Sequence, residues 1–370
     1  MSRSMPTVAV IGAGAWGTAL AAHLAAKPVA VRLWAYEKEV VESITRDREN
    51  RMFLSGVPLP ETLSATGSLH DAVTGADALV FAVPSHVARR VLRQLASVMT
   101  EPMPFISATK GIEEDTLALM TQVMTEELPP SIHPFLMVLS GPSFAAEVSA
   151  RKPTVVCLAG GNAEAVKQIQ GLFMTPTFRV YADDDLIGVQ LGGALKNVMA
   201  VAAGVVDGLG LGHNARAALI TRGLAEMIRL GSAMGADPRT FYGLSGVGDL
   251  ILTCTGALSR NHSVGVRLGQ GERLEASLAS MHAAAEGVRT AKAALGLARR
   301  LAWRCRSRRL MQCFSKGNPA AKRSGTSWSG KPREKRESRE PGTTDVIAGA
   351  SSRGIAGYFG CPAAAAHAAL

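Results

Sequence analysis

The chain opens with a strand, a glycine turn and a helix in immediate succession, and this order constrains its fold more than any other feature. The segment TVAVIGAGAWGTALAAHLAA starts with a β-branched run at residues 7–11, passes three glycines and continues as an Ala/Leu-rich stretch from about Trp16. A second apolar run follows at residues 30–35. A strand, a turn, a helix and a second strand within about 30 residues are typical of a βαβ unit. We therefore expect a parallel sheet at the start of the chain.

The rest of the chain divides into three parts by pattern. Buried-strand sequences recur as DALVFAVP, PFISATKG, FLMVLSGP and TVVCLAGG, with intervals that fit helices. This alternation predicts an α/β, doubly wound (Rossmann) domain over residues 1–188. Residues 189–302 are rich in Ala, Leu and Gly with helical spacing of apolar residues, which predicts an all-α second domain. Residues 303–370 are rich in Arg, Ser, Gly and Pro without a sustained period, which predicts a disordered basic tail.

The charge of the chain is concentrated in that tail. Of the formal net charge of +10, residues 303–370 contribute 13 Lys/Arg against 4 Asp/Glu, and the remainder is nearly neutral. The body lacks a basic stripe interleaved with aromatic residues, so we expect no nucleic-acid partner there. The five cysteines show no metal-ligand spacing, so we expect no metal. Reduced cysteines and the lack of an apolar leader before the first strand predict a cytoplasmic protein.

The glycine turn has the pattern G-x-G-x-x-G, formed by Gly12, Gly14 and Gly17. Between a strand and a helix, this pattern predicts a dinucleotide site with the phosphates at the helix N-terminus. The acidic residue expected about 20 residues later is Glu37, which favours NAD through a ribose hydroxyl. Lys38 beside it suits the 2′-phosphate of NADP instead. The choice between NAD and NADP therefore stays open, as does a purely solvent-facing role for Glu37.

An apolar segment at residues 186–206 holds a single charged side chain, Lys196. Four glycines, Gln190 and Asn197 argue against a membrane span, although the length suffices for one. Two interpretations remain. Lys196 either extends to the surface of a core helix or lies in an apolar pocket where desolvation lowers its pKa for chemistry.

Several stretches together resemble one enzyme family. They read GAGAWGTAL, AVPSH, SATKGIE, LSGPSFAAEV, LGGALKNV, GLGHNARAALITRG, GLSGVGDLILTC, SRN and AEGVRTA, in order from residue 5 to about 300. This set resembles the bacterial NAD(P)-dependent glycerol-3-phosphate dehydrogenases. The resemblance implies hydride transfer between an NAD(P)H cofactor and the pair sn-glycerol 3-phosphate and dihydroxyacetone phosphate. It also implies a role in supplying glycerol 3-phosphate for phospholipid synthesis.

The resemblance implies catalytic roles for four residues. Lys196 would exchange a proton with the C2 oxygen, Lys110 would stabilise the developing alkoxide, Asp249 would balance the lysine charges, and Thr253 would hydrogen-bond nearby. The implied substrate contacts are Lys110, Gly141, Ser143, Lys196, Asp249, Ser259, Arg260 and Asn261. The implied cofactor contacts are Gly12, Gly14, Trp16, Gly17, Tyr36, Glu37, Phe53, Lys110, Ala145, Arg260, Ala284 and Glu286. Residue type alone also allows purely structural roles. Asp249 could cap a helix, and Arg260 could be an ordinary surface residue.

The chain departs from the family after Arg300, where the Arg/Ser/Cys-rich text replaces an apolar helical continuation. A shifted reading frame is one hypothesis for this tail. Two other functions therefore stay open: a two-domain Rossmann reductase acting on a hydroxy acid, and a dinucleotide-binding protein that has lost its activity. A third is nucleic-acid or partner binding through the basic tail. We expect a small-molecule substrate and no membrane span, and a homodimer is the assembly to test.

Overall fold

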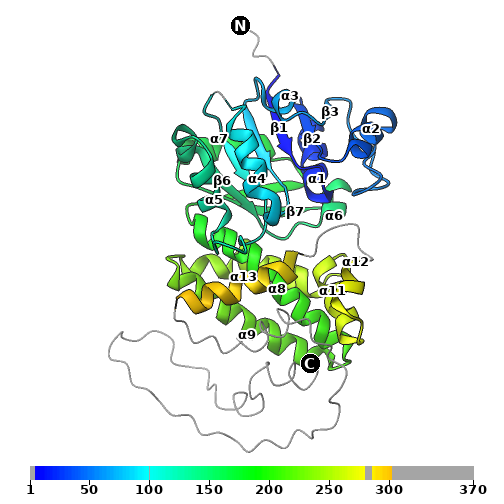
Figure 1. Cartoon of the computed structure of the whole chain (residues 1–370), viewed down its shortest axis with the longest axis vertical. Helices are drawn as coiled ribbons and strands as arrows, with labels where there is room; N and C mark the ends of the chain where they lie inside the picture. Colours follow the sequence, from blue (N-terminus) through cyan, green and yellow to red (C-terminus); the bar gives the residue numbers. More distant parts are fainter. Residues whose placement is uncertain (1–4, 100, 280–285, 302–370) are drawn as a thin grey trace, which may run out of the picture.

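The computed structural model describes residues 5–99, 101–279 and 286–301, which form a sheet domain above a helical domain (Figure 1). The sheet has eight strands in the order β3-β2-β1-β4-β5-β6-β7-β8. Every neighbouring pair is parallel except β6 and β7. This confirms the expected doubly wound, mostly parallel sheet. The strands are β1 (Thr7–Ile11), β2 (Ala30–Trp34), β3 (Leu63–Thr66), β4 (Ala78–Phe81), β5 (Phe105–Ser107), β6 (Leu136–Ser140), β7 (Thr154–Gly160) and β8 (Phe178–Asp183).

Helices cover both faces of the sheet because successive side chains of each buried strand point to opposite faces. In β1, Val8 and Val10 pack into a core with α1 and α7, whereas Ala9 and Ile11 pack into a second core with α3, α4 and α5. The sheet domain's helices are α1 (Ala15–Ala25), α2 (Lys38–Asp47), α3 (Leu69–Val73), α4 (Ser85–Ala96), α5 (Met120–Glu127), α6 (Ala145–Ser149), α7 (Ala163–Phe173) and the 3-10 helix η1 (Pro130–Phe135).

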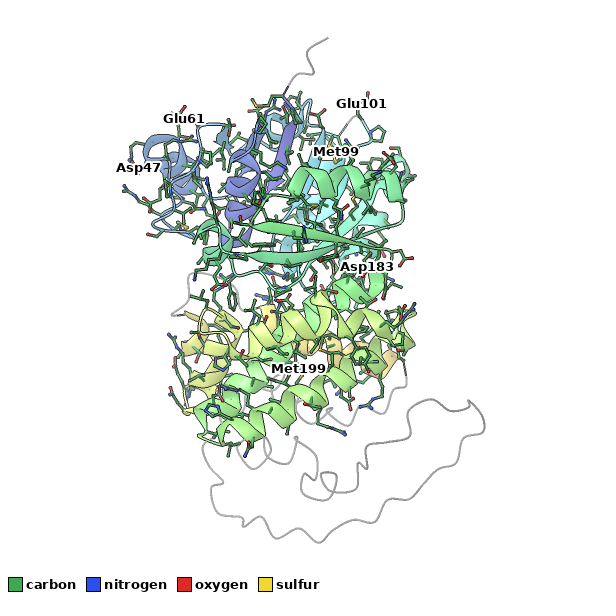
Figure 2. The ribbon with its side chains drawn as sticks, turned by 180° about the vertical axis from the view of Figure 1, so that it is seen from behind. Asp47, Glu61, Met99, Glu101, Asp183 and Met199 are labelled. Atoms are coloured by element: carbon green, nitrogen blue, oxygen red, sulfur yellow. The ribbon has the colours of Figure 1, made fainter. Side chains whose placement is uncertain are left out.

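The second domain contains only helices among its described residues, as its Ala/Leu/Gly-rich pattern predicts. They are α8 (Leu186–Gly208), α9 (Gly212–Ala233), η2 (Pro238–Tyr242), η3 (Leu244–Gly248), α10 (Asp249–Thr255), α11 (Arg260–Gly269), α12 (Leu274–Ala279) and α13 (Glu286–Arg300). Figure 2 shows Asp183, at the end of β8, at the level where the two domains meet, and Met199 of α8 within the helical domain.

Helix α8 is the centre of the helical domain and packs against α9, α10, α11 and α13. It is the one described helix long and apolar enough to cross a membrane, and the window that meets this criterion is entirely buried inside the protein. Its apolar character is therefore explained by burial on all sides. Its N-terminus is capped by Asp185, whose side chain accepts a hydrogen bond from the Gly188 N–H at 2.8 Å.

The crossing of α8 and α11 is close because glycines face each other there. A Cβ at Gly204 of α8 would lie 2.1 Å from the His262 carbonyl oxygen, and one at Gly265 of α11 would lie 2.0 Å from that of Val201. The two backbones therefore touch without side chains between them. This contact fixes the start of α11, which carries the SRN sequence, against the helix that carries Lys196.

The two edge strands, β3 and β8, were not among the predicted strands. Each has buried residues on one side only, so neither reads as a continuous apolar run. The predicted tail at residues 303–370 lies outside the described residues.

Candidate active site

The glycine turn joins β1 to α1, and its three glycines differ in what surrounds them. Gly12 has a φ of +111°, a conformation that side chains disfavour. A Cβ at Gly17 would lie 1.9 Å from the Gly12 carbonyl oxygen, so only glycine lets α1 approach the turn. Gly14 is the N-cap of α1, and a Cβ there would meet nothing within 4 Å. The turn therefore leaves open space at the N-terminus of an 11-residue helix.

The residues expected at the adenosine end follow β2, which pairs with β1 in the sheet. Glu37 is the N-cap of α2 and is partly exposed, and Lys38 beside it is exposed. Tyr36 is 74% exposed, whereas Phe53 packs partly buried against the core that contains α1. This arrangement places both Glu37 and Lys38 at the C-terminal end of β2, where open α/β sheets bind ligands.

A charged centre lies where the two domains meet, with the Asp249 carboxylate in the middle. Asp249 is the first residue of α10 and is fully buried. One of its oxygens accepts a hydrogen bond from Lys196 Nζ, and the other accepts one from Lys110 Nζ at 3.1 Å. Lys110 follows β5 in the sheet domain, and Lys196 lies in α8. The centre thus joins three segments that are far apart in the sequence.

Lys196 does not extend to solvent, because only 7% of the residue is exposed. The pKa of Lys196 is lowered to about 7: desolvation by burial and the positive charge of Lys110 lower it, while the Asp249 carboxylate opposes both by raising it. At neutral pH this amine is therefore close to the point where it exchanges a proton. The structure favours the second interpretation of the sequence, a lysine held in a desolvated site.

Three further residues surround this centre. Thr253, one turn further along α10, donates from its Oγ1 to the Asp249 carbonyl oxygen at 2.6 Å and lies 3.3 Å from the Asp249 carboxylate. Gly141 has a φ of +143°, and its carbonyl oxygen accepts hydrogen bonds from Ser143 Oγ at 2.9 Å and from Lys110 Nζ at 3.4 Å. Thr253, Gly141 and Ser143 are thus brought together with the lysines, as the resemblance implies.

Trp16 links the glycine turn to the charged centre. The Lys110 ammonium lies 5.9 Å from the centroid of the Trp16 ring, within the range of a cation–π interaction. The Trp16 Nε1 atom is buried and has no hydrogen-bond partner among the described residues. Ala145 begins α6, a helix that packs against α1. Trp16, in the glycine turn, therefore lies next to Lys110.

The SRN sequence forms the start of α11. Ser259 is its N-cap and accepts a hydrogen bond from the His262 N–H at 3.3 Å. Arg260 is exposed and forms no ion pair within the described ranges 5–99, 101–279 and 286–301, and partial desolvation lowers its pKa. Asn261 donates to the Asn197 Oδ1 at 3.0 Å. A helix N-terminus with an unpaired arginine beside it suits an anion.

Glu286 and Ser85 form a hydrogen-bonded contact between the domains. Glu286, the first residue of α13, accepts from Ser85 Oγ at 2.6 Å and from the Ser85 N–H at 3.1 Å. Ser85 is the first residue of α4, so the carboxylate lies at a helix N-terminus. Burial raises the pKa of Glu286, and the two hydrogen bonds from Ser85 oppose this rise.

Two residues at this site are not among those expected from the sequence, although both lie in motifs shared with the family. Ser85 belongs to AVPSH, and Asn197 follows Lys196 directly in LGGALKNV. Asn197 is buried, and its Oδ1 holds the Asn261 amide. A polar residue beside the lysine of an apolar helix was the available signal. Ala284, an implied cofactor contact, lies outside the described residues.

Comparisons with known proteins agree with this geometry. Residues 7–166 match the model of the NAD-dependent glycerol-3-phosphate dehydrogenase N-terminus, and residues 185–312 match that of the C-terminus. The sequence motifs predict that the similarity to the family stops after Arg300, but the second match extends to residue 312. The glycerol-3-phosphate dehydrogenase [NAD(P)+] of Geobacter sulfurreducens is 57% identical over 79% of this chain and 88% of its own length. That of Desulfotalea psychrophila is 51% identical over 81% of this chain and 90% of its own length.

Solved structures give the same result. The crystal structure of glycerol-3-phosphate dehydrogenase from Coxiella burnetii is 37% identical, with a TM-score of 0.81 over 85% of this chain and 96% of that chain. A ketopantoate reductase from Ralstonia eutropha is 14% identical with a TM-score of 0.52, a likeness that concerns the fold alone. With both family models matched and relatives above 50% identity across most of its length, this chain belongs to the NAD(P)-dependent glycerol-3-phosphate dehydrogenase family.

Proposed function

We propose that this protein interconverts sn-glycerol 3-phosphate and dihydroxyacetone phosphate, with Lys196 as the acid and base. The observation that carries this proposal is the placement of Lys196 and Lys110 on the two oxygens of one buried carboxylate, Asp249. A base is most useful when its pKa lies near the working pH, and the pKa of Lys196 is lowered to about 7.

The residues of the glycine turn fit a dinucleotide cofactor. A Cβ at Gly14 would fill open space in front of α1, and glycine keeps that space free for a pyrophosphate. Trp16 lies within the turn, and its buried Nε1 has no hydrogen-bond partner among the described residues. NAD(P), when bound, supplies the acceptor or donor of the hydride at C2. We assign its other contacts to Tyr36, Glu37, Phe53, Ala145, Ala284 and Glu286.

Lys196 exchanges the proton in this proposal. In the direction of oxidation, its neutral amine accepts the proton of the C2 hydroxyl as that carbon loses a hydride. In the direction of reduction, its ammonium returns a proton to the carbonyl oxygen. Asp249 and Thr253 hold the amine in place, because the carboxylate oxygen that binds Lys196 Nζ also lies 3.3 Å from the Thr253 hydroxyl.

Lys110 stabilises negative charge at the same oxygen. Its ammonium lies between Asp249, the Gly141 carbonyl oxygen and the Trp16 ring, so its position is fixed by three contacts. A fixed positive charge that faces a developing alkoxide lowers the barrier without reorganisation. We place Gly141 and Ser143 beside the substrate on the same grounds.

The phosphate of the substrate is assigned to Ser259, Arg260 and Asn261 at the start of α11. The N–H groups of a helix N-terminus bind anions, and the planar guanidinium of Arg260 binds phosphate oxygens in pairs. Arg260 is exposed and forms no ion pair among the described residues, so its guanidinium is available to an anion.

The test is an absorbance assay of reduced nicotinamide with dihydroxyacetone phosphate, performed with NADH and with NADPH. We expect turnover that depends on the phosphate of the substrate. Turnover of a hydroxy acid in its place would favour the other reductase class. A protein that binds cofactor but turns over neither substrate would be a dinucleotide-binding protein without activity.

Four further properties are proposed on narrower grounds. We place the domain boundary near residue 188, where β8 has ended and α8 begins. A cytoplasmic location is supported by Cys157 and Cys254, which are both free and buried. A homodimer would be detected by light scattering. Mass spectrometry of peptides beyond residue 303 would show whether the protein contains this tail sequence, and so would test the hypothesis of a shifted reading frame.

A further inference from the structure

Asn50 is a buried polar residue that none of the assigned roles explains. It lies after α2, in a short loop closed by a bridge between Asn50 and Leu54, and it is fully buried. Figure 2 shows Asp47, the last residue of α2, at the outer edge of the sheet domain. A buried amide costs free energy unless its donors and acceptor are bonded, so its partners indicate its role.

The Asn50 amide is bonded on both sides. Its Nδ2 donates to the Ala13 carbonyl oxygen at 2.8 Å and to Thr18 Oγ1 at 2.8 Å, and its Oδ1 accepts from the Phe53 N–H at 3.1 Å. A carbonyl oxygen only accepts and a backbone N–H only donates, so these partners fix which way the amide points. Asn50 thus connects the glycine turn to the loop that carries Phe53.

The contact with Ala13 determines how the turn presents its backbone. Ala13 lies between Gly12 and Gly14, and its carbonyl oxygen also accepts from Thr18 Oγ1 at 3.1 Å. In a trans peptide the C=O and the next N–H point in opposite directions. Holding the Ala13 oxygen in the protein interior therefore turns the Gly14 N–H outward, toward the open space in front of α1.

The Gly14 N–H is left for a ligand. Within the described part of the chain, it has no hydrogen-bond acceptor, although its neighbour Gly12 donates to the Trp34 carbonyl oxygen at 3.1 Å. An outward N–H at a helix N-terminus is a donor suited to a phosphate oxygen. We propose that Asn50 is a positioning residue for the dinucleotide, which orients the Ala13–Gly14 peptide so that its N–H meets the pyrophosphate. This inference rests on the proposed cofactor site and adds a residue to it.

The experiment measures the Kd for NADH and for NADPH by nicotinamide fluorescence, with thermal unfolding recorded for each protein. Asn50→Leu keeps the size of the side chain and removes all three hydrogen bonds. Gln170→Leu is the matched control, since Gln170 Nε2 donates to the Val180 carbonyl oxygen at 2.7 Å between α7 and the far edge strand β8. Both changes therefore delete a side-chain amide bonded to a backbone carbonyl.

We expect Asn50→Leu to raise the Kd of the preferred cofactor at least about tenfold, since the Gly14 N–H no longer has a fixed direction. Gln170→Leu should leave the Kd within about twofold, and steady-state assays of Asn50→Leu should show the change in the cofactor KM rather than in kcat. A folded Asn50→Leu protein with an unchanged Kd would overturn the proposal. An equal rise in both variants would also overturn it, because the effect would then be general destabilisation.

A second variant covers the case in which Asn50→Leu fails to fold. Asn50→Asp keeps the shape and the acceptor for the Phe53 N–H, but a carboxylate has no donor for the Ala13 oxygen. Its Kd should rise at least as much as expected for Asn50→Leu, and an unchanged Kd would refute the assignment. If the unmodified protein binds neither dinucleotide, both the proposed function and this role of Asn50 are wrong.

Discussion

The glycine turn at residues 12–17 is formed by backbone atoms, whereas the centre around Asp249 is formed by side chains from three separate segments. In the turn, a steric limit at Gly17 and open space at Gly14 define the site. In the centre, two lysines share one fully buried carboxylate. The comparison teaches that binding and chemistry are separable here. In the proposed mechanism, the turn fixes where the dinucleotide lies, and the centre sets the protonation state of Lys196.

Among the changes to binding, the largest effect should come from filling the glycine turn. Gly17→Ala places a Cβ 1.9 Å from the Gly12 carbonyl oxygen, so α1 and the turn must move apart. We expect the cofactor Kd to rise roughly 100-fold, equivalent to an overpacking cost of about 3 kcal/mol. Gly171→Ala in α7, where a Cβ meets nothing within 4 Å, is the control and should bind cofactor normally. Normal binding by Gly17→Ala would mean that the turn is not the site.

Removing the arginine of α11 should affect substrate and spare the cofactor. Arg260→Ala should lower kcat/KM for dihydroxyacetone phosphate roughly 30-fold, equivalent to about 2 kcal/mol, the lower end for a charged contact. We choose the lower end because Arg260 is exposed. Titration with NADH should give a Kd that changes far less. A normal KM for dihydroxyacetone phosphate in this variant would remove Arg260 from the phosphate site.

The pH dependence should have opposite signs in the two directions. Oxidation needs a neutral Lys196, whose pKa is lowered to about 7, so kcat/KM for glycerol 3-phosphate should fall roughly tenfold per unit below that pH. Reduction needs the ammonium, so its kcat/KM should fall above the same pH. The Asp249 carboxylate raises the pKa of Lys196, so Asp249→Asn should move both inflections to lower pH. An inflection that stays in place would exclude Lys196 as its origin.

The smallest effect concerns cofactor choice at the end of β2. If Glu37 accepts a hydrogen bond from a ribose hydroxyl, Glu37→Ala should shift the preference from NAD toward NADP. We expect roughly a fivefold change in the ratio of the two kcat/KM values. This corresponds to about 1 kcal/mol, the net contribution of one hydrogen bond. An unchanged ratio would leave Glu37 as a surface residue and turn attention to Lys38.

The sequence predicted the local parts of this molecule well. The strand at residues 7–11, the turn and the start of α1 are encoded within one short stretch, because apolar runs and glycines act on their immediate neighbours. The edge strands β3 and β8 were missed because their outer sides are polar. The antiparallel pairing of β6 with β7 depends on chain direction, which residue type does not encode.

The residues that meet around Asp249 could be named from the sequence, but the contacts between them could not. The lone charge of Lys196 in an apolar helix pointed to a special role, and the family resemblance supplied Lys110 and Asp249. Nothing in the residue pattern indicated that Glu286 would bond Ser85, 201 positions earlier in the chain. Such pairs arise only when two domains meet, so they follow from tertiary packing rather than from local sequence.

The most direct test of the account is the kcat of Lys196→Met at saturating dihydroxyacetone phosphate and cofactor. Methionine has a similar length and suits the apolar surroundings of α8, so α8 should fold and the separate glycine turn should still bind NADH. We predict that kcat falls roughly 10²–10⁴-fold, the range for loss of a general acid or base, and that Lys196→Arg does not restore it. A folded, NADH-binding Lys196→Met protein with near-normal kcat would contradict the central role given to this lysine.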